Sequence, residues 1–355
     1  MQALKNAWYA AVWGVDLEPG TLVRRRLLGE DLVLFRGPDG APRALADACA
    51  HKLAPLHLGT LLPDSRLRCN YHGLVFDAEG QCVHNPHGSG QIPPAMKVQR
   101  YAAIERHSMV WVWMGPAAAD PARVPDFSVL DRGLPGTKFD HITMQADHQL
   151  ITDNLLDLSH VSFLHRGLLG NEETENAEID VQQTPDTVSV TRIMRDAPPP
   201  GLFALMYKKD ARRVDVWTTI RWTAPGTLLN DTVVCDPGQS PAEGTGIFGV
   251  HLLTPQDEHS TLYHFTSVRK GPQYVAPEDL DEVRRKLSEL RRYAFEEQDA
   301  PMIAGQHEIL AQRRRNGQPV QPVLLNIDAG PLRARRLLEG LVAAERSLTD
   351  ERAAT

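Results

Sequence analysis

The pattern of apolar and polar positions divides the chain into two parts. Between Tyr9 and Gly115, apolar runs of strand length alternate with turn-rich segments such as Gly37-Pro38-Asp39-Gly40. This pattern predicts a small all-β domain over residues 1–118, followed by a linker rich in alanine and proline. The clearest strands are expected at Leu32–Arg36, Leu74–Asp77 and Met109–Trp113.

The second part, residues 126–355, mixes helical and strand patterns. Helices are expected over about Asp147–Leu164, Pro277–Arg315 and Pro331–Leu348. Because the strands cluster between these helices instead of alternating with them, the pattern predicts an α+β domain with an antiparallel sheet. The strands are expected at Thr187–Arg192, Val214–Thr223, Thr227–Val234, Ile247–Leu253 and Leu262–Val268.

Composition narrows the class of protein. With 38 basic and 45 acidic residues the net charge is −7, which does not indicate binding to nucleic acid or to an anionic membrane. No apolar run approaches the roughly 20 residues that span a bilayer, and the N-terminus does not resemble a signal peptide. Four cysteines are too few for a disulfide scaffold. We therefore expect a cytoplasmic protein whose cysteines are metal ligands or buried thiols.

Two short segments each carry one cysteine and one histidine. Cys49-Ala50-His51 is followed after seventeen residues by Cys69-Asn70-Tyr71-His72. A zinc site is the alternative, but structural zinc sites usually take paired Cys-x2-Cys and His-x3–5-His spacing. A Rieske [2Fe–2S] cluster needs two cysteines on one iron and two histidines on the other, so Cys49, His51, Cys69 and His72 predict that cluster. Other nearby candidates are expected to be structural residues: His57, His84, His87, Cys82 and Cys235.

A second candidate metal site lies about 80 residues further along the chain. His160 and His165 lie five residues apart, about 140° around an ideal helix, so they can share one metal only if the helix ends or distorts between them. Asn154 and Asp157 precede His160 at helical spacing and complete a polar seam among leucines. Such a seam must be satisfied by hydrogen bonds or by a metal.

Two histidines and one carboxylate are the ligand set of non-haem Fe(II) oxygenases. The carboxylate must come from elsewhere, and the segment around Glu296, Glu297 and Asp299 offers three candidates. Pro301 is expected to bend the helix there and turn Asp299 inward. Glu296 and Glu297 fit an exposed face, so Asp299 is the predicted third ligand.

The chain as a whole resembles the oxygenase components of Rieske-type aromatic oxygenases, and most of all the O-demethylase branch that includes vanillate demethylase and dicamba monooxygenase. Ala50 and Lys52 depart from the usual proline and arginine of that family, but neither is a ligand. The segments that carry the resemblance are Lys5–Tyr9, Tyr71–Leu74, Gly80–Gly88, Asp153–Asp157 and Asn326–Gly330.

The resemblance implies a catalytic domain of the helix-grip type, and a homotrimer in which the cluster of one subunit faces the mononuclear iron of the next. Asp157 would then link His72 of one subunit to His160 of its neighbour. Electrons would come from NADH through a separate reductase, in some members with a ferredoxin between. Gly244–Gly249 spells a dinucleotide fingerprint, but it continues as a predicted strand and should not bind nicotinamide.

The resemblance also implies a substrate. Asn230 and His251 match the positions that hold the substrate carboxylate in dicamba monooxygenase, where an amide donor and an imidazole suit an anion. The expected reaction is O2-dependent O-demethylation of a methoxylated aromatic carboxylate, which yields a phenol and formaldehyde. Two alternatives stay open: hydroxylation at a ring, benzylic or N-methyl position, and electron transfer without oxygen chemistry.

Overall fold

The computed structural model describes residues 3–132, 134–208 and 210–353. The chain folds into two compact units, the first formed by Met1–Asp126 with Thr254–Asp257, and the second by Phe127–Leu253 with Glu258–Thr355. The short segment Thr254–Asp257 belongs to the first unit because its backbone pairs there: the carbonyl oxygens of Pro255 and Gln256 accept from Leu28 and Gly29.

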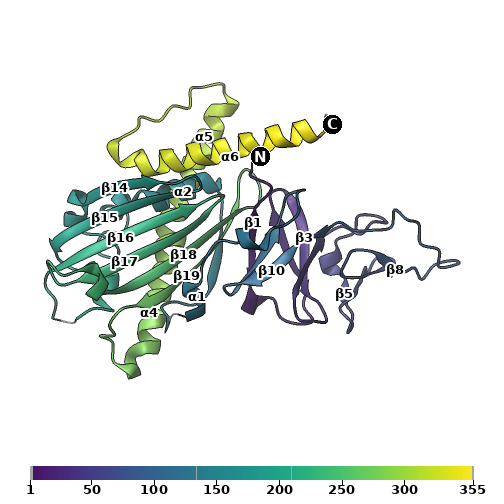
Figure 1. Cartoon of the computed structure of the whole chain (residues 1–355), viewed down its shortest axis with the longest axis horizontal. Coiled ribbons are helices and arrows are strands. Elements are labelled where there is room, and N and C mark those ends of the chain that lie inside the picture. Colours follow the sequence, from purple (N-terminus) through teal and green to yellow (C-terminus); the bar gives the residue numbers. More distant parts are fainter. Residues whose placement is uncertain (1–2, 133, 209, 354–355) are drawn as a thin grey trace. The chain divides into compact units, whose positions relative to one another are not determined.

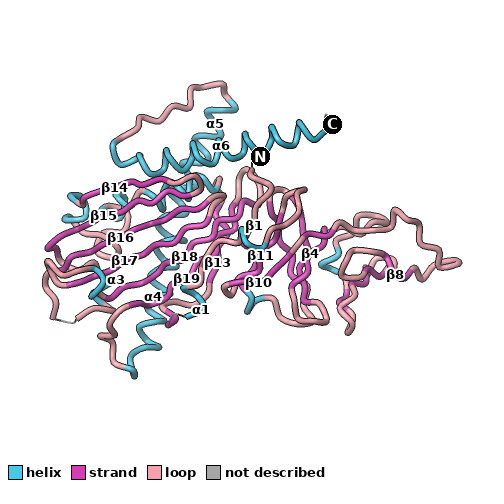
Figure 2. The backbone as a smooth tube through the Cα atoms, viewed as in Figure 1, coloured by secondary structure: helices cyan, strands magenta, loops and turns pink. Residues whose placement is uncertain are grey.

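The described part of the first unit is built from antiparallel strands and short turns (Figure 2). Three small sheets run in the orders β1-β11-β10, β2-β3-β4-β9 and β5-β6-β7-β8. The predicted all-β architecture is confirmed. The strands are β1 (Trp8–Trp13), β2 (Val23–Leu27), β3 (Glu30–Arg36), β4 (Pro42–Ala46), β5 (Thr60–Leu61), β6 (Leu67–Arg68), β7 (Val75–Phe76), β8 (Cys82–His84), β9 (Arg100–Tyr101), β10 (Ala103–Arg106) and β11 (Met109–Trp113).

The second unit holds one antiparallel sheet in the order β12-β19-β18-β17-β16-β15-β14, with β13 paired to β19 (Figure 1). The α+β class with an antiparallel sheet is confirmed, and the five predicted strands are present. The strands β12, β13 and β14 were not predicted. The strands are β12 (Leu134–Pro135), β13 (Asp140–Met144), β14 (Glu178–Gln183), β15 (Thr187–Ala197), β16 (Val214–Thr223), β17 (Thr227–Cys235), β18 (Thr245–Pro255) and β19 (Thr261–Lys270).

Because β18 begins at Thr245, the glycine-rich segment Gly244–Gly249 continues into strand and opens no helix, as expected. The helices α2 and α6 pack on each other, α2 also against β16, and α6 also against β14 and β15 (Figure 1). None of the helices that the structure describes combines the length and apolar character of a membrane span. The α-helices are α1 (Val129–Arg132), α2 (His148–Leu156), α3 (Gly201–Ala204), α4 (Leu280–Tyr293), α5 (Ala300–Arg315) and α6 (Ala329–Ala353).

Two helices differ from the prediction in ways that matter for the site. The helix expected to reach Leu164 stops at Leu156, and a separate 3-10 helix covers Leu158–Ser162. The long helix expected over Pro277–Arg315 is continuous but contains a π-helical segment, Ala294–Asp299, between α4 and α5.

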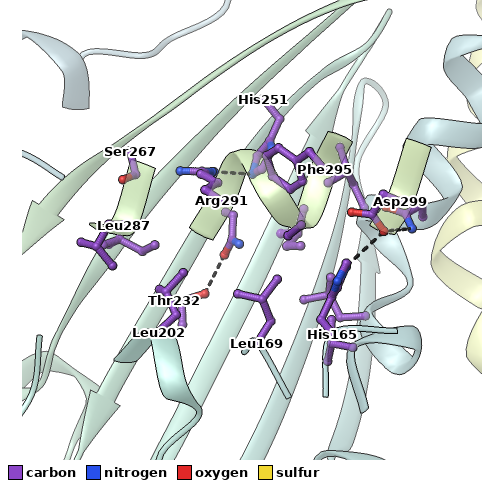
Figure 3. Close-up of a pocket in the computed structure, with 18 of the residues that line it drawn as sticks. His165, Leu169, Leu202, Thr232, His251, Ser267, Leu287, Arg291, Phe295 and Asp299 are labelled. Carbon is purple, nitrogen blue, oxygen red and sulfur yellow. Dashed lines mark hydrogen bonds and ion pairs between the residues drawn. The ribbon is translucent and has the colours of Figure 1, made fainter. Parts of the chain in front are cut away.

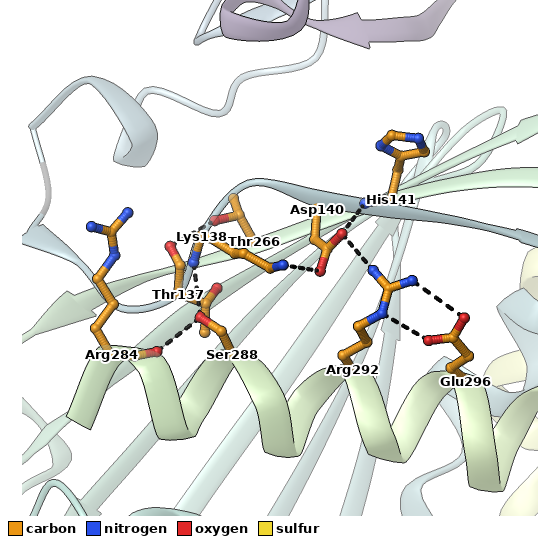
Figure 4. A network of polar contacts seen from close by, with 9 residues as sticks. All are labelled: Thr137, Lys138, Asp140, His141, Thr266, Arg284, Ser288, Arg292 and Glu296. Carbon is orange, nitrogen blue, oxygen red and sulfur yellow. Dashed lines mark hydrogen bonds and ion pairs between the residues drawn. The ribbon is translucent and has the colours of Figure 1, made fainter. Parts of the chain in front are cut away.

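Polar contacts fix α4 against the segment that leads into β13 (Figure 4). The backbone N–H of Lys138 donates to Ser288 Oγ at 3.0 Å, and that hydroxyl donates to the carbonyl of Arg284 at 2.8 Å. Arg292 pairs with Asp140 Oδ1 at 2.8 Å and with Glu296 Oε2 at 2.7 Å. These bonds set the rotation of α4. They therefore also set the direction in which the π-helical segment and the buried Arg291, next to Arg292, face.

Candidate metal centres

The two loops that carry the cysteine–histidine pairs have the same backbone hydrogen bonds. Cys49 N–H donates to the carbonyl five residues on, at Ala54, and the Cys49 carbonyl accepts from Leu53. Cys69 repeats both bonds with Leu74 and Gly73. The fourth residue after each cysteine has positive φ, 56° at Leu53 and 74° at Gly73, which explains the glycine in the second loop.

The loops bring the four predicted cluster ligands together. The thiols of Cys49 and Cys69 interact, and both side chains lie in a buried apolar cluster with Phe35, Leu56 and Phe76. The imidazole rings of His51 and His72 meet edge to face with centroids 4.6 Å apart. Two buried sulfurs and two partly exposed imidazoles form a compact donor set of the Rieske type, with the histidine side toward the surface.

Burial is the main influence on the pKa values of Cys49 and His72. It raises the pKa of Cys49, and the adjacent Cys69 thiol acts in the same direction. Burial and the neighbouring His51, His87 and Lys52 lower the pKa of His72. A thiolate pair and two neutral imidazoles are what two iron ions would select.

Three further histidines and cysteines of this unit, His57, His87 and Cys82, have structural partners. His57 Nδ1 lies 2.5 Å from Asp47 Oδ2, and its backbone N–H donates to the same carboxylate. His87 Nε2 donates to the carbonyl of His72 at 2.7 Å, which holds the second ligand loop. Cys82 is buried with its thiol near the His84 carbonyl.

In the second unit, α2 ends before the first predicted histidine. Asp157 N–H closes the last helical bond to Asp153, and Asp157 then caps the following 3-10 helix. The backbone makes tight turns at His160 and His165, whose carbonyls accept from residues three and four positions on. The helix break that the five-residue spacing requires is therefore present.

Three predicted ligand atoms converge beyond this break. Asp299 Oδ1 lies 3.1 Å from His165 Nε2 and 3.7 Å from His160 Nε2, and the three atoms lie within 4.8 Å of one another. Ligands about 2.1 Å from one ion at right angles are about 3.0 Å apart, so the set fits a single metal ion. Asn154 Nδ2, also predicted here, lies 3.1 Å from Asp299 Oδ1 and 3.5 Å from His160 Nε2.

The π-helical segment directs Asp299 inward. Glu296 and Glu297 are exposed, whereas Asp299, which ends the segment, is buried. A π turn inserts one extra residue and rotates the residues after it relative to a regular helix. Pro301 sits in the first turn of α5, where its missing N–H is tolerated, and the π segment immediately precedes it.

Hydrogen bonds on the far side of each imidazole orient its Nε2 toward the centre. His160 Nδ1 donates to the Asp157 carbonyl at 2.7 Å, and His165 Nδ1 donates to Gln298 Oε1 at 2.8 Å. Gln298 is fixed in turn because its amide group donates to the Leu164 carbonyl at 2.8 Å. Gln298 was not predicted as a partner of His165. Its position beside the predicted ligand Asp299 could have suggested that role, because a metal-binding histidine usually donates its other N–H to a nearby acceptor.

Electrostatics differ between the two histidines. Burial lowers the pKa of His160, against the opposing charge of Asp299. Burial also acts to lower the pKa of His165, but the hydrogen bond and charge of Asp299, with the bond to Gln298, outweigh it and raise this pKa.

Known proteins share both halves of this arrangement. Residues 7–101 match the Rieske [2Fe–2S] domain, and residues 144–344 match the vanillate O-demethylase oxygenase C-terminal domain. The second match covers more than half of the chain. The chain belongs to this family of Rieske oxygenase components.

Individual relatives are similar over nearly the whole oxygenase. The chloroacetanilide N-alkylformylase oxygenase component of Rhizorhabdus wittichii is 34% identical over 96% of both chains. The dicamba O-demethylase oxygenase component of Stenotrophomonas maltophilia is 32% identical, covering 97% of this chain and 99% of its own. A crystal structure of dicamba monooxygenase bound to dicamba superposes with a TM-score of 0.88 at 32% identity, covering 98% and 100% of the chains. Another, with non-haem iron and dicamba, gives 0.81 at 31% identity over 98% and 99%.

Family membership confirms the predicted Rieske cluster over the zinc alternative and identifies the oxygenase as an oxidoreductase.

Asp157 contacts His160 differently from the expected carboxylate–imidazole bond. The backbone carbonyl accepts the His160 proton, whereas the carboxylate Oδ1 accepts from the backbone and hydroxyl of Ser159 at 2.9 and 2.5 Å. The buried Arg192 has its Nη1 3.9 Å from the same oxygen. Among the described residues, Oδ2 has no hydrogen-bonding partner. An extended backbone at Asp157 separates the carbonyl from the carboxylate and gives the residue two directions of contact.

A pocket of about 760 Å³, open solvent included, leads away from the three ligands. Its metal end is formed by His160, His165 and Asp299, and its polar end by Asn230, His251, Ser267 and Arg291. Asp299 and His165 lie on the right of Figure 3, with Arg291 and Ser267 on the left. The walls between are apolar and include Leu169, Leu202, Phe203, Ile247, Leu287 and Phe295. Asn230 and His251 thus lie in the same pocket as the metal ligands.

Replacing Asp299 by alanine is expected to lower iron affinity by at least about 100-fold, because losing a direct ligand should cost more than losing an outer partner. Anaerobic iron titration followed by metal analysis measures this. Glu297→Ala, two residues away and exposed, is the matched control and should bind iron normally. Equal loss in both variants would remove Asp299 from the ligand set.

Gln298→Leu should lower iron affinity by about 10- to 100-fold while leaving the ligand atoms themselves in place, because His165 loses the bond that fixes its ring. The [2Fe–2S] absorbance should not change, since that cluster lies in the other unit. Unaltered iron affinity would show that packing alone orients His165.

Proposed function

We propose that this oxygenase catalyses the O2-dependent O-demethylation of a methoxylated aromatic carboxylate. The observation that carries the proposal is the pocket itself, with metal ligands at one end, polar donors at the other and apolar walls between. Dicamba O-demethylase, a relative by both sequence and structure, supports the reaction type.

The overall reaction consumes one O2, two electrons and two protons per methyl group. One oxygen atom enters a C–H bond of the O-methyl group and the other leaves as water. The resulting hemiacetal breaks the bond between its methylene carbon and the phenolic oxygen, and its hydroxyl proton passes to that oxygen, which yields a phenol and formaldehyde. When bound, the [2Fe–2S] cluster supplies single electrons, and Fe(II) supplies the site at which O2 is reduced.

The chain's own side chains bind and orient the substrate. The apolar walls hold the aromatic ring and exclude water, and the polar end accepts the acidic group. A ring held between these ends directs its methoxy group toward His160, His165 and Asp299. Binding thereby places the methyl carbon within reach of the metal end.

The electron path is proposed to cross between two copies of the chain in a homotrimer. The Asp157 carbonyl accepts a hydrogen bond from His160 Nδ1. In this proposal, the Asp157 carboxylate accepts a hydrogen bond from His72 of a neighbouring copy. A residue placed in this way fixes one imidazole with its carbonyl and the other with its carboxylate, and shortens the path. Electrons come from NADH through a separate reductase, which in some family members works with a ferredoxin.

N-dealkylation is the second candidate, because the N-alkylformylase relative is as similar as the O-demethylase. Ring or benzylic hydroxylation would use the same metal centre with a different substrate orientation. Electron transfer alone does not account for His160, His165 and Asp299 meeting beside a pocket.

Formaldehyde release tests the reaction type. With a reductase supplied, ortho-, meta- and para-methoxybenzoates should yield one formaldehyde per NADH consumed for at least one isomer. NADH oxidation with a hydroxylated ring product and no formaldehyde would contradict O-demethylation. Formaldehyde from N-methylanilines but from no methoxybenzoate would favour the second candidate.

Asp157→Asn should retain both metals yet reduce turnover by at least about 100-fold, because the amide keeps the Ser159 contact but loses the negative charge proposed to accept a hydrogen bond from His72 of the neighbouring copy. Single-turnover reduction of the cluster, followed by its reoxidation in the presence of substrate, isolates the electron-transfer step. Asp186→Asn, an exposed aspartate near a strand end, serves as the control. Full activity of Asp157→Asn would remove the bridge from the account.

A further inference from the structure

The polar end of the pocket contains a buried cation without an acidic partner. Arg291 lies on α4 with only 8% of its surface exposed. Its Nη1 donates to the carbonyl of Thr266 at 2.9 Å, and its Nη2 donates to His251 Nε2 at 3.2 Å. No carboxylate of the described residues forms a salt bridge with it.

The next residue on the helix shows the contrast. Arg292 has two carboxylate partners, Asp140 and Glu296, and lies at the partly exposed edge of the helix (Figure 4). Arg291 points instead into the pocket (Figure 3). One helix thus carries adjacent arginines of which the exposed one is neutralised and the buried one is not.

A buried unpaired charge is costly to a folded protein, so its retention calls for a counter-charge. Burial lowers the pKa of Arg291 to about 10, with the nearby Tyr263 opposing this effect, and the guanidinium therefore remains protonated near pH 7. The pocket supplies the remaining space beside that cation. An anionic group on the bound ligand would supply the counter-charge that Arg291 lacks.

His251 cannot be that anion's donor in this arrangement. Arginine only donates, so His251 Nε2 must accept from Arg291, and Nδ1 then carries the proton and donates to Tyr263 Oη at 2.5 Å. Burial and the adjacent Arg291 lower the His251 pKa well below its usual value, which keeps the ring neutral. The expectation that His251 donates to the substrate is therefore corrected: both ring nitrogens are engaged, and the ring orients Arg291.

A glycine leaves room for this arrangement. A Cβ atom at Gly249 would lie 2.9 Å from Arg291 Nη2, 3.1 Å from His251 Nε2 and 3.3 Å from Asn230 Cβ. The three side chains therefore surround one point on β18. Asn230 Oδ1 accepts from Thr232 at 2.7 Å, which leaves its amide N–H groups as donors beside the guanidinium.

We propose that Arg291 binds the carboxylate of the aromatic substrate, with Asn230 as a second donor and His251 as the residue that positions the guanidinium. This assignment rests on the proposed function, and it specifies which residues recognise the carboxylate of the proposed substrate. A guanidinium and an amide present N–H groups that match the oxygens of a carboxylate, and the charge selects the ionised acid over a neutral analogue.

Binding of matched acids and amides tests the proposal without turnover. Isothermal titration calorimetry of the holoprotein at pH 7.5 compares ortho-, meta- and para-methoxybenzoates with the corresponding methoxybenzamides. Wild type should bind at least one acid about tenfold or more tightly than its amide. Arg291→Gln should weaken binding of that acid by about 10- to 100-fold and that of its amide by less than about threefold.

Further variants separate charge from structure. Arg291→Lys keeps the charge and should keep the preference for the acid. His251→Gln, which can still accept from Arg291, should keep it as well, whereas His251→Leu should reduce it about tenfold. Arg292→Gln is the matched control and should bind like wild type. Thermal unfolding checks that each variant is folded.

The proposal is overturned if wild type has no preference for any acid over its amide, or if Arg291→Gln retains that preference. The outcome is independent of the reaction type. Selective acid binding without formaldehyde would refute O-demethylation and leave Arg291 as the anion site. Formaldehyde release together with unchanged acid binding in Arg291→Gln would support O-demethylation and refute the role of Arg291.

Discussion

The approach of Asp299 to His160 and His165 is the constraint on which the second unit depends. A buried carboxylate is costly without compensation, and here two imidazoles and the Asn154 amide surround it. Two interruptions of regular helix make the approach possible. The end of α2 at Leu156 allows histidines five residues apart to face one point, and the π segment turns Asp299 toward them. A regular helix at either place would move one ligand away from the other two.

Backbone interruptions of this kind explain what the sequence could and could not predict. Period-two alternation of burial is clear in β15, whereas β18 and β19 are buried along most of their length. The strands β15 to β19 were predicted within a few residues, because their apolar runs are long and bounded by turn residues. The ligand residues were predicted because cysteine, histidine and aspartate at such spacing have few structural roles. The end of α2 was only inferred as a requirement, since Ser159 and His160 are compatible with helix. The π segment leaves no pattern in the residue types at all.

Side-chain directions were the least predictable part of the site. The sequence placed Asp157 beside His160, but only the structure shows that the carbonyl makes that contact and the carboxylate turns to Ser159. Arg291 was missed because it stands in a helix rich in charged residues, where a solvated arginine is the ordinary expectation. Its burial depends on the rotation of α4. Contacts with residues distant in sequence set that rotation. In the proposed function, the pocket separates two tasks, with charge recognition at the polar end and oxygen chemistry at the metal end.

A crystal structure of the iron-loaded protein with a bound methoxybenzoate would test this division of tasks most directly. The account predicts iron on His160 Nε2, His165 Nε2 and Asp299, the substrate carboxylate on Arg291 Nη2 and the Asn230 amide, and the methoxy carbon directed toward the iron. A carboxylate bound to the iron with the methoxy group beside Arg291 would contradict it, as would iron held by a different set of side chains.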